Sequence, residues 1–219
     1  MTEGTTSEGN KTQDVLHFTP ELVKILDSPQ AIRLLEDPDY YIIVEILRKR
    51  PMTIREIEDA YKLRASDHET VEPKSYNTIY RYIKALEKEG LVIPGGKRVE
   101  FGKTAAETLF SRTAKLFHFG CPPDMTEEGR EFVDRVLGGL MLLYGGSKVT
   151  ESCLRETINE ISVTMKDEIT KLAQVDHKVK LDEILAGEWG IMIKTLDYIA
   201  FLSIILNHPE LVKKLKDCF

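Results

Sequence analysis

The sequence predicts a mainly α-helical protein with a small β element, in which an N-terminal domain of helices and one hairpin precedes an all-α C-terminal domain. Apolar residues recur at helical spacing along most of the 219 residues. Pro94-Gly95-Gly96, between two short apolar segments, provides turn chemistry for one hairpin. We expect a disordered or short helical segment at 1–27, a first domain at 28–120 and a second domain at 121–219.

The first helices are marked by their start signals. Residues 1–14 are polar and should be disordered, and Pro20–Leu26 is expected to form a short helix. Ser28 followed by proline opens a helix over Gln30–Glu36. Asp39 then caps a helix over Tyr40–Lys49.

A capping box marks the next helix. Thr53 and Glu56 have its spacing, and we expect the helix to run to about Tyr61, followed by a loop over Leu63–Pro73.

The stretch Ser75–Leu91 predicts an amphipathic helix. Its apolar face consists of Tyr76, Ile79, Ile83 and Leu86. The opposite face carries no carboxylate and consists of Asn77, Arg81, Lys84 and Lys88. Such a helix fits the DNA major groove, where Arg and Asn meet base edges and Lys meets phosphates, although a solvated helix surface has the same composition.

Two extended segments, Leu91–Ile93 and Arg98–Phe101, are expected to flank the glycine turn as a β wing. Thr108–Phe119 is expected to return as a further strand, although Thr104–Phe110 is also compatible with a helix.

The order helix, helix, helix, hairpin is that of a winged helix-turn-helix. "LLEDPDYYIIVEILRKRPMTIREIEDAY" followed by "SYNTIYRYIKALEKEGLV" resembles the ArsR-type winged-helix regulators, particularly archaeal ones, over Leu34–Phe119. The resemblance implies a transcriptional regulator that binds double-stranded DNA. Tyr40 stands where the family often has Arg, the turn Lys62–Lys74 is long, and the family's metal-sensing cysteine pair is absent, so no metal site is expected.

These patterns assign DNA contacts to particular residues. Asn77 and Arg81 are expected to read bases, with Tyr80 and Tyr76 as alternatives if the long loop tilts the helix. The residues expected to hold phosphates are Lys74, Ser75, Tyr76, Lys84, Lys97, Arg98 and Lys103. Arg112 and Lys115 are expected either to reinforce them or to be solvated strand residues.

The second domain shows no enzymatic motif. We expect helices from Asp124 to Tyr144, Thr150 to Val175, Glu188 to Leu206, and from Asn207 onward. Their apolar surface predicts a homodimer through residues 124–219. A small apolar effector could lie around Trp189, Met192 and Phe201, but core packing is the simpler interpretation of these side chains.

Composition excludes several classes of protein. Net charge is −6, and only residues 39–120 carry more Lys and Arg than Asp and Glu, as expected for a polyanion-binding segment. Three scattered cysteines predict neither a disulfide framework nor a zinc site, and together with the polar N-terminus they fit a cytoplasmic protein without a cofactor or membrane span. The alternative function is a winged-helix module that binds proteins rather than DNA.

Overall fold

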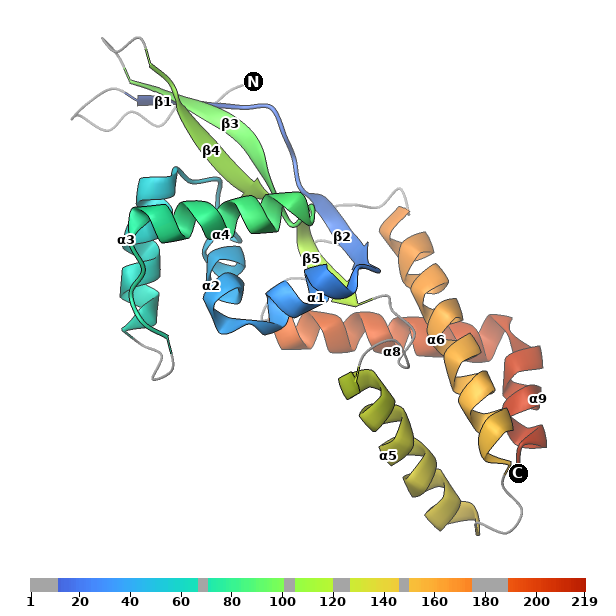
Figure 1. The fold of residues 1–219 in the computed structure, drawn as a ribbon. Helices are drawn as coiled ribbons and strands as arrows, with labels where there is room; N and C mark the ends of the chain where they lie inside the picture. Colours follow the sequence, from blue (N-terminus) through green and yellow to red (C-terminus); the bar gives the residue numbers. More distant parts are fainter. Residues whose placement is uncertain (1–11, 67–70, 101–104, 120–126, 146–149, 175–188) are drawn as a thin grey trace. The chain divides into compact units, whose positions relative to one another are not determined.

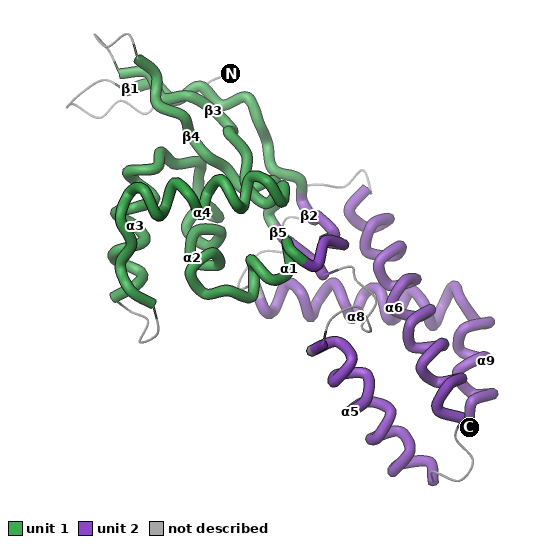
Figure 2. Tube along the Cα trace, viewed as in Figure 1, with its two compact units in different colours: residues 1–21, 30–115 green, residues 22–29, 116–219 purple. Residues whose placement is uncertain are grey.

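The computed structural model describes residues 12–66, 71–100, 105–119, 127–145, 150–174 and 189–219. The chain divides into two compact units, the first made of residues 1–21 and 30–115 and the second of residues 22–29 and 116–219 (Figure 2). The expected domains, 28–120 and 121–219, are continuous in sequence. The observed second unit is not, because it also takes residues 22–29 from the N-terminal part of the chain.

Unit 1 contains the three helices and the hairpin of a winged helix (Figure 1). Its elements are β1 (Thr12–Leu16), α1 (Pro29–Glu36), α2 (Pro38–Ile46), α3 (Ile54–Ala65), α4 (Tyr76–Lys88), β3 (Val92–Glu100) and β4 (Glu107–Arg112). Its core is aliphatic and includes Ile42, Ile43, Ile57, Ile79, Ile83, Leu86 and Leu109. The predicted inward face of α4 is thus confirmed for Ile79, Ile83 and Leu86, whereas Tyr76 is 42% exposed.

The caps set where the helices begin. The Thr53 hydroxyl accepts from the Glu56 backbone N–H at 3.3 Å, and the Glu56 carboxylate accepts from the Thr53 N–H at 2.8 Å, so the capping box is confirmed. Asp37, not Asp39, caps α2, because its carboxylate accepts from the Asp39 N–H at 2.9 Å. α2 ends earlier than predicted and α3 extends past Tyr61 to Ala65.

The wing differs from the prediction at its glycines. β3 runs without interruption through Pro94, Gly95 and Gly96, and its pairing with β4 shifts register there. A Cβ on Gly95 would lie 2.7 Å from the Ser111 Cβ, and one on Gly96 would lie 2.7 Å from the Val15 carbonyl oxygen. These glycines therefore allow neighbouring strands to approach and do not form the turn. The connection between β3 and β4 comes later, at residues 101–106.

From Thr12, where the described residues begin, the N-terminal segment is extended rather than disordered or helical, and the prediction for residues 1–11 lies outside the described residues. β1 adds an antiparallel strand to the free edge of β3, giving the order β1–β3–β4. Pro20–Leu26, predicted to be helical, contains β2 (Glu21–Leu26), which pairs with β5 (Ala114–Phe119). The single strand expected over Thr108–Phe119 is instead two strands, β4 and β5, which belong to different sheets.

Unit 2 packs four described helices with β2 and β5. The helices are α5 (Glu127–Tyr144), α6 (Glu151–Gln174), α8 (Trp189–Asn207) and α9 (Pro209–Asp217), close to the predicted bounds. One core cluster joins β2, β5, α6 and α8 through Val23, Leu116, Ile169, Met192, Leu196 and Ala200. A second joins α5, α6 and the C-terminus through Val133, Leu137, Leu154 and Cys218.

Unit 2 contains a disulfide that the sequence did not predict, and its helix α8 is only partly buried within one chain. Cys153 and Cys218 form a disulfide, which their 65-residue separation had not indicated. α8 buries one stripe only, while Tyr198, Leu202 and Leu206 are exposed, as are Phe132 and Leu143 of α5. By length and composition, Gly190–Asn207 is apolar enough to cross a membrane, as a core helix of a soluble protein also can be.

Candidate nucleic-acid interface

The outward face of α4 carries positive charge and aromatic rings. Its exposed residues are Tyr76, Asn77, Tyr80, Arg81, Lys84 and Lys88, which include three cations and no carboxylate. The two glutamates near its C-terminus, Glu87 and Glu89, are half-buried. Gly90 ends the helix with φ 67°, a backbone conformation that glycine adopts most easily.

A groove of about 370 Å³ lies beside this face, between the start of α3, the side of α4 and the two wing strands. It is lined by Thr53, Ile54, Arg55, Tyr76, Tyr80, Lys84, Pro94, Glu107, Thr108 and Phe110. Lys84 lies 5.7 Å above the centre of the Tyr80 ring, within cation–π range. The groove therefore combines two cations with two exposed tyrosine rings and the N-terminus of a twelve-residue helix, where backbone N–H groups attract anions.

A carboxylate beneath the helices fixes the orientation of α4. Asp39 of α2 accepts hydrogen bonds from the Tyr61 hydroxyl at 2.8 Å and the Tyr82 hydroxyl at 2.9 Å. Lys74, just before α4, pairs with the same carboxylate at 3.0 Å. Burial acts to raise the pKa of Asp39, but these three partners together lower it, and burial with the Asp39 bond raises the pKa of Tyr82 to about 12.

Two predicted phosphate contacts are committed elsewhere. The Arg98 guanidinium makes two bonds to Asp14, of 2.6 and 2.7 Å, and a third ion pair of 2.9 Å to Glu56. Lys74 is held by Asp39 with 22% of its side chain exposed. Both charges are thus paired within unit 1, and the assignment of Arg98 and Lys74 as phosphate contacts stays a prediction.

The other predicted contacts have varied surroundings. Arg81 is exposed and its guanidinium bonds to the Thr78 hydroxyl at 3.3 Å, while Lys84 pairs with Glu87 at 2.6 Å. Ser75 precedes α4 and its hydroxyl lies 3.2 Å from that of Thr78. Lys97 is exposed in mid-strand rather than at a turn. Lys103 lies outside the described residues.

Arg55 is the residue that the sequence analysis missed. It is exposed in the first turn of α3 and lines the groove, and it makes no ion pair within the part of the chain that the structure describes. A single arginine in a charged helix gives no signal by itself. Its position two residues after the Thr53 cap, in the first turn of the helix that precedes α4, is the clue that was available.

Other polar groups have structural roles. Arg112 is 4% exposed and donates to the Lys115 carbonyl at 3.0 Å, and burial lowers its pKa to about 10, so it is not a solvated strand residue. Met192 packs in the core, as the simpler interpretation of that residue expected. No group of three potential metal ligands occurs among the described residues.

Comparisons with known proteins identify no family. No protein-family model matches the chain, and no curated protein matches it. Among solved structures, the chain is similar to Bacillus subtilis PadR in complex with operator DNA, with 14% sequence identity and a TM-score of 0.27 over 82% of this chain and 98% of that one. Likeness at this level carries no functional argument, and neither the ArsR-type nor the archaeal resemblance receives support from it.

Proposed function

We propose that the protein is a DNA-binding transcriptional regulator that reads its operator with α4. The observation that carries this proposal is the exposed face of α4, which holds Arg81, Lys84, Lys88 and an asparagine, with one carboxylate, Glu87, paired with Lys84 beside it, in a chain of net charge −6. A polyanion would bind at such a face because the rest of the chain repels it. No catalytic role is proposed.

We assign base contacts and phosphate contacts to different residues according to where each one lies. Arg81 and Asn77 lie one turn apart on the exposed face. The Arg81 guanidinium can donate two hydrogen bonds to guanine, and the Asn77 amide can pair with adenine. Arg55 and Lys84 border the groove and Lys88 continues the same face, so these three neutralise backbone phosphates. Lys97 contacts a phosphate from the wing, where it lies within strand β3 and not at a turn.

Recovery of bound genomic DNA tests the proposal. The full chain is mixed with fragmented genomic DNA of its source organism, with and without competitor, and the bound fragments are sequenced. A common sequence should emerge and survive competition. Fluorescence anisotropy then compares that site with a shuffled duplex for the wild type, Arg81→Ala and the control Arg33→Ala, an exposed cation of α1. Absence of binding to any duplex at low salt would refute the proposal.

We also propose that unit 2 makes the protein a homodimer. Large apolar side chains remain exposed on α5 and α8, including Leu142, Leu143, Tyr198, Leu202 and Leu206, and Leu142 and Leu206 are 87% and 79% exposed. Tyr198, Leu202 and Leu206 follow one another at four-residue spacing on α8, and an exposed apolar stripe of this kind marks interaction sites in soluble proteins. A second copy supplies the same side chains in return, since most homodimers are two-fold symmetric.

Light scattering at tens of micromolar decides the oligomeric state. The wild type should have a mass of about 50 kDa against 25.0 kDa for one chain. Tyr198→Asp with Leu206→Glu should shift it to the monomer, and Lys194→Glu, a change at an exposed charge on the same helix, should not. A monomeric wild type would refute the dimer. The same apolar faces also fit the alternative of a protein-interaction module, which is favoured if the chain binds no DNA but captures a partner through them.

A further inference from the structure

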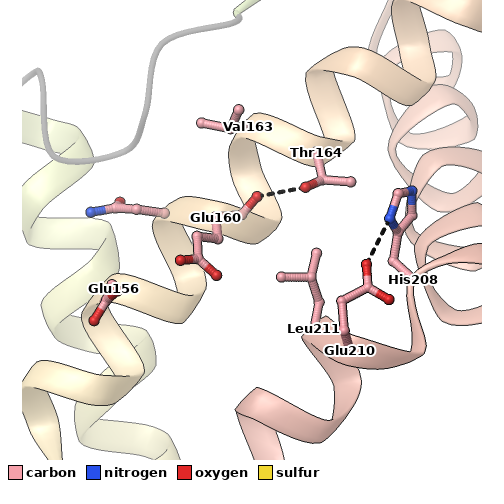
Figure 3. Close-up of a pocket in the computed structure, with 8 residues that line it drawn as sticks. Glu156, Glu160, Val163, Thr164, His208, Glu210 and Leu211 are labelled. Carbon is pink, nitrogen blue, oxygen red and sulfur yellow. Dashed lines mark hydrogen bonds and ion pairs between the residues drawn. The ribbon is translucent and has the colours of Figure 1, made fainter.

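A cavity in unit 2 lies between α6 and α9, apart from the proposed DNA-binding face. Its volume is about 470 Å³, within the range of roughly 300–1,000 Å³ typical of small-molecule sites. Val163 and Leu211 line it from the two helices, and Glu156, Glu160, Glu210 and His208 stand around it (Figure 3). The cavity is thus apolar in its walls and acidic at its rim.

The charges around the cavity do not balance. Among the residues that the structure describes, three carboxylates face one ammonium, that of Lys214, and one histidine, His208. With His208 neutral the rim keeps two net negative charges, and with His208 protonated it keeps one. The carboxylates do not converge as metal ligands, because no group of three ligand side chains occurs among the described residues. An organic cation fits this pattern better than a metal ion.

Lys214 shows how the rim holds an ammonium. Its Nζ lies 3.0 Å from Glu156 Oε1 and 2.7 Å from Glu160 Oε1. Both bonds go to the Oε1 atoms, and among the described residues no hydrogen bond reaches Oε2 of Glu156 or of Glu160. In Figure 3 the Glu160 carboxylate and the Leu211 side chain both point into the space between the two helices.

We propose that this cavity binds a small organic cation, a primary amine with a short aliphatic chain. The ammonium pairs with Glu160 and Glu210, and the chain lies against Val163 and Leu211. Such a molecule would be an effector of unit 2. The site extends the proposed function but does not rest on it, since binding to the cavity is measured without DNA.

Calorimetric titration of the full chain with n-hexylammonium chloride tests the proposal, with sodium hexanoate and hexanol as probes of the charge and of the chain. Hexylammonium should bind, and the other two should bind at least tenfold more weakly. The double variant Glu160→Gln, Glu210→Gln should weaken hexylammonium at least tenfold, and Val163→Asn should weaken it severalfold. The control Glu131→Gln, an exposed glutamate of α5 paired with Arg135, should leave the affinity unchanged.

Circular dichroism and the melting temperature establish that each variant is folded before its affinity is compared. Val163 is 48% exposed, so its replacement leaves the core intact and keeps the test open if the double variant does not fold. The proposal is overturned if hexylammonium does not bind at 10 mM, if hexanol binds as tightly, or if folded Val163→Asn and wild type bind it equally.

Discussion

Replacement of Glu56 by glutamine should destabilise unit 1 in a way that depends on pH. Burial acts to raise the pKa of Glu56, but the Thr53 N–H, Arg50 and Arg98 outweigh it and hold the pKa at about 2, against 4.5 for a free side chain. That difference corresponds to about 3 kcal/mol at neutral pH. The side chain is 26% exposed, so solvent screening reduces the expected loss in Glu56→Gln to about 2 kcal/mol.

The pH dependence has a definite sign. A carboxyl whose folded pKa is depressed stabilises the fold above its unfolded pKa, and this stabilisation is lost as pH falls from 4.5 toward 2. Urea unfolding followed by the amide NMR signals of α3 should therefore give a smaller difference between wild type and Glu56→Gln at pH 3.5 than at pH 7.

Glu58→Gln is the matched control. It removes a carboxylate of the same helix whose one ion pair with a described residue is that with Lys62, at 2.8 Å, and should cost about 0.5 kcal/mol or less. Equal losses in Glu56→Gln at the two pH values, or a loss no larger than that of the control, would show that the ion pairs around Arg98 do not stabilise unit 1.

Four further predictions concern binding and stability. If four cations of the α3–α4 face neutralise phosphates, log K for DNA binding should fall against log salt concentration with a slope near −3.6 for each bound winged helix. Arg81→Ala should reduce the preference for the true site over random DNA. Fluorescence anisotropy measures both. Cys153→Ser should lower the stability of unit 2 by about 4 kcal/mol, because the disulfide closes a 65-residue separation in the unfolded chain, and urea unfolding measures this loss. Gly96→Ala should lower the melting temperature of unit 1 because its Cβ would meet the Val15 carbonyl oxygen at 2.7 Å, whereas Gly138→Ala, in open space on α5, should not lower that of unit 2.

Local signals predicted the helices of unit 1 well. The Thr53–Glu56 box and the 3.6-residue period of α4 depend on residues a few positions apart, and the structure confirms both. Gly90 likewise ends α4 through its own backbone conformation. Such elements are readable because the interactions that define them lie within one stretch of sequence.

Errors arose where the deciding partner is distant in sequence. Pro94-Gly95-Gly96 has the composition of a turn, but the contacts that make it a strand come from β1, about eighty residues earlier. The ion pair between Arg98 and Asp14, 84 residues apart, was likewise not visible in the sequence around either residue. The apolar residues of 189–207 predict a helix, α8. They do not show which face of that helix packs against the rest of the chain and which stays exposed.

The interrupted order of the two units has a consequence during synthesis of the chain. Unit 2 takes residues 22–29 as well as 116–219, and β2 pairs with β5. β2 therefore leaves the ribosome long before its partner strand exists, and at about 5–20 residues per second the wait is roughly 5 to 20 seconds. Unit 1 can be completed in that interval, but unit 2 cannot begin to close its sheet until the wing has been translated.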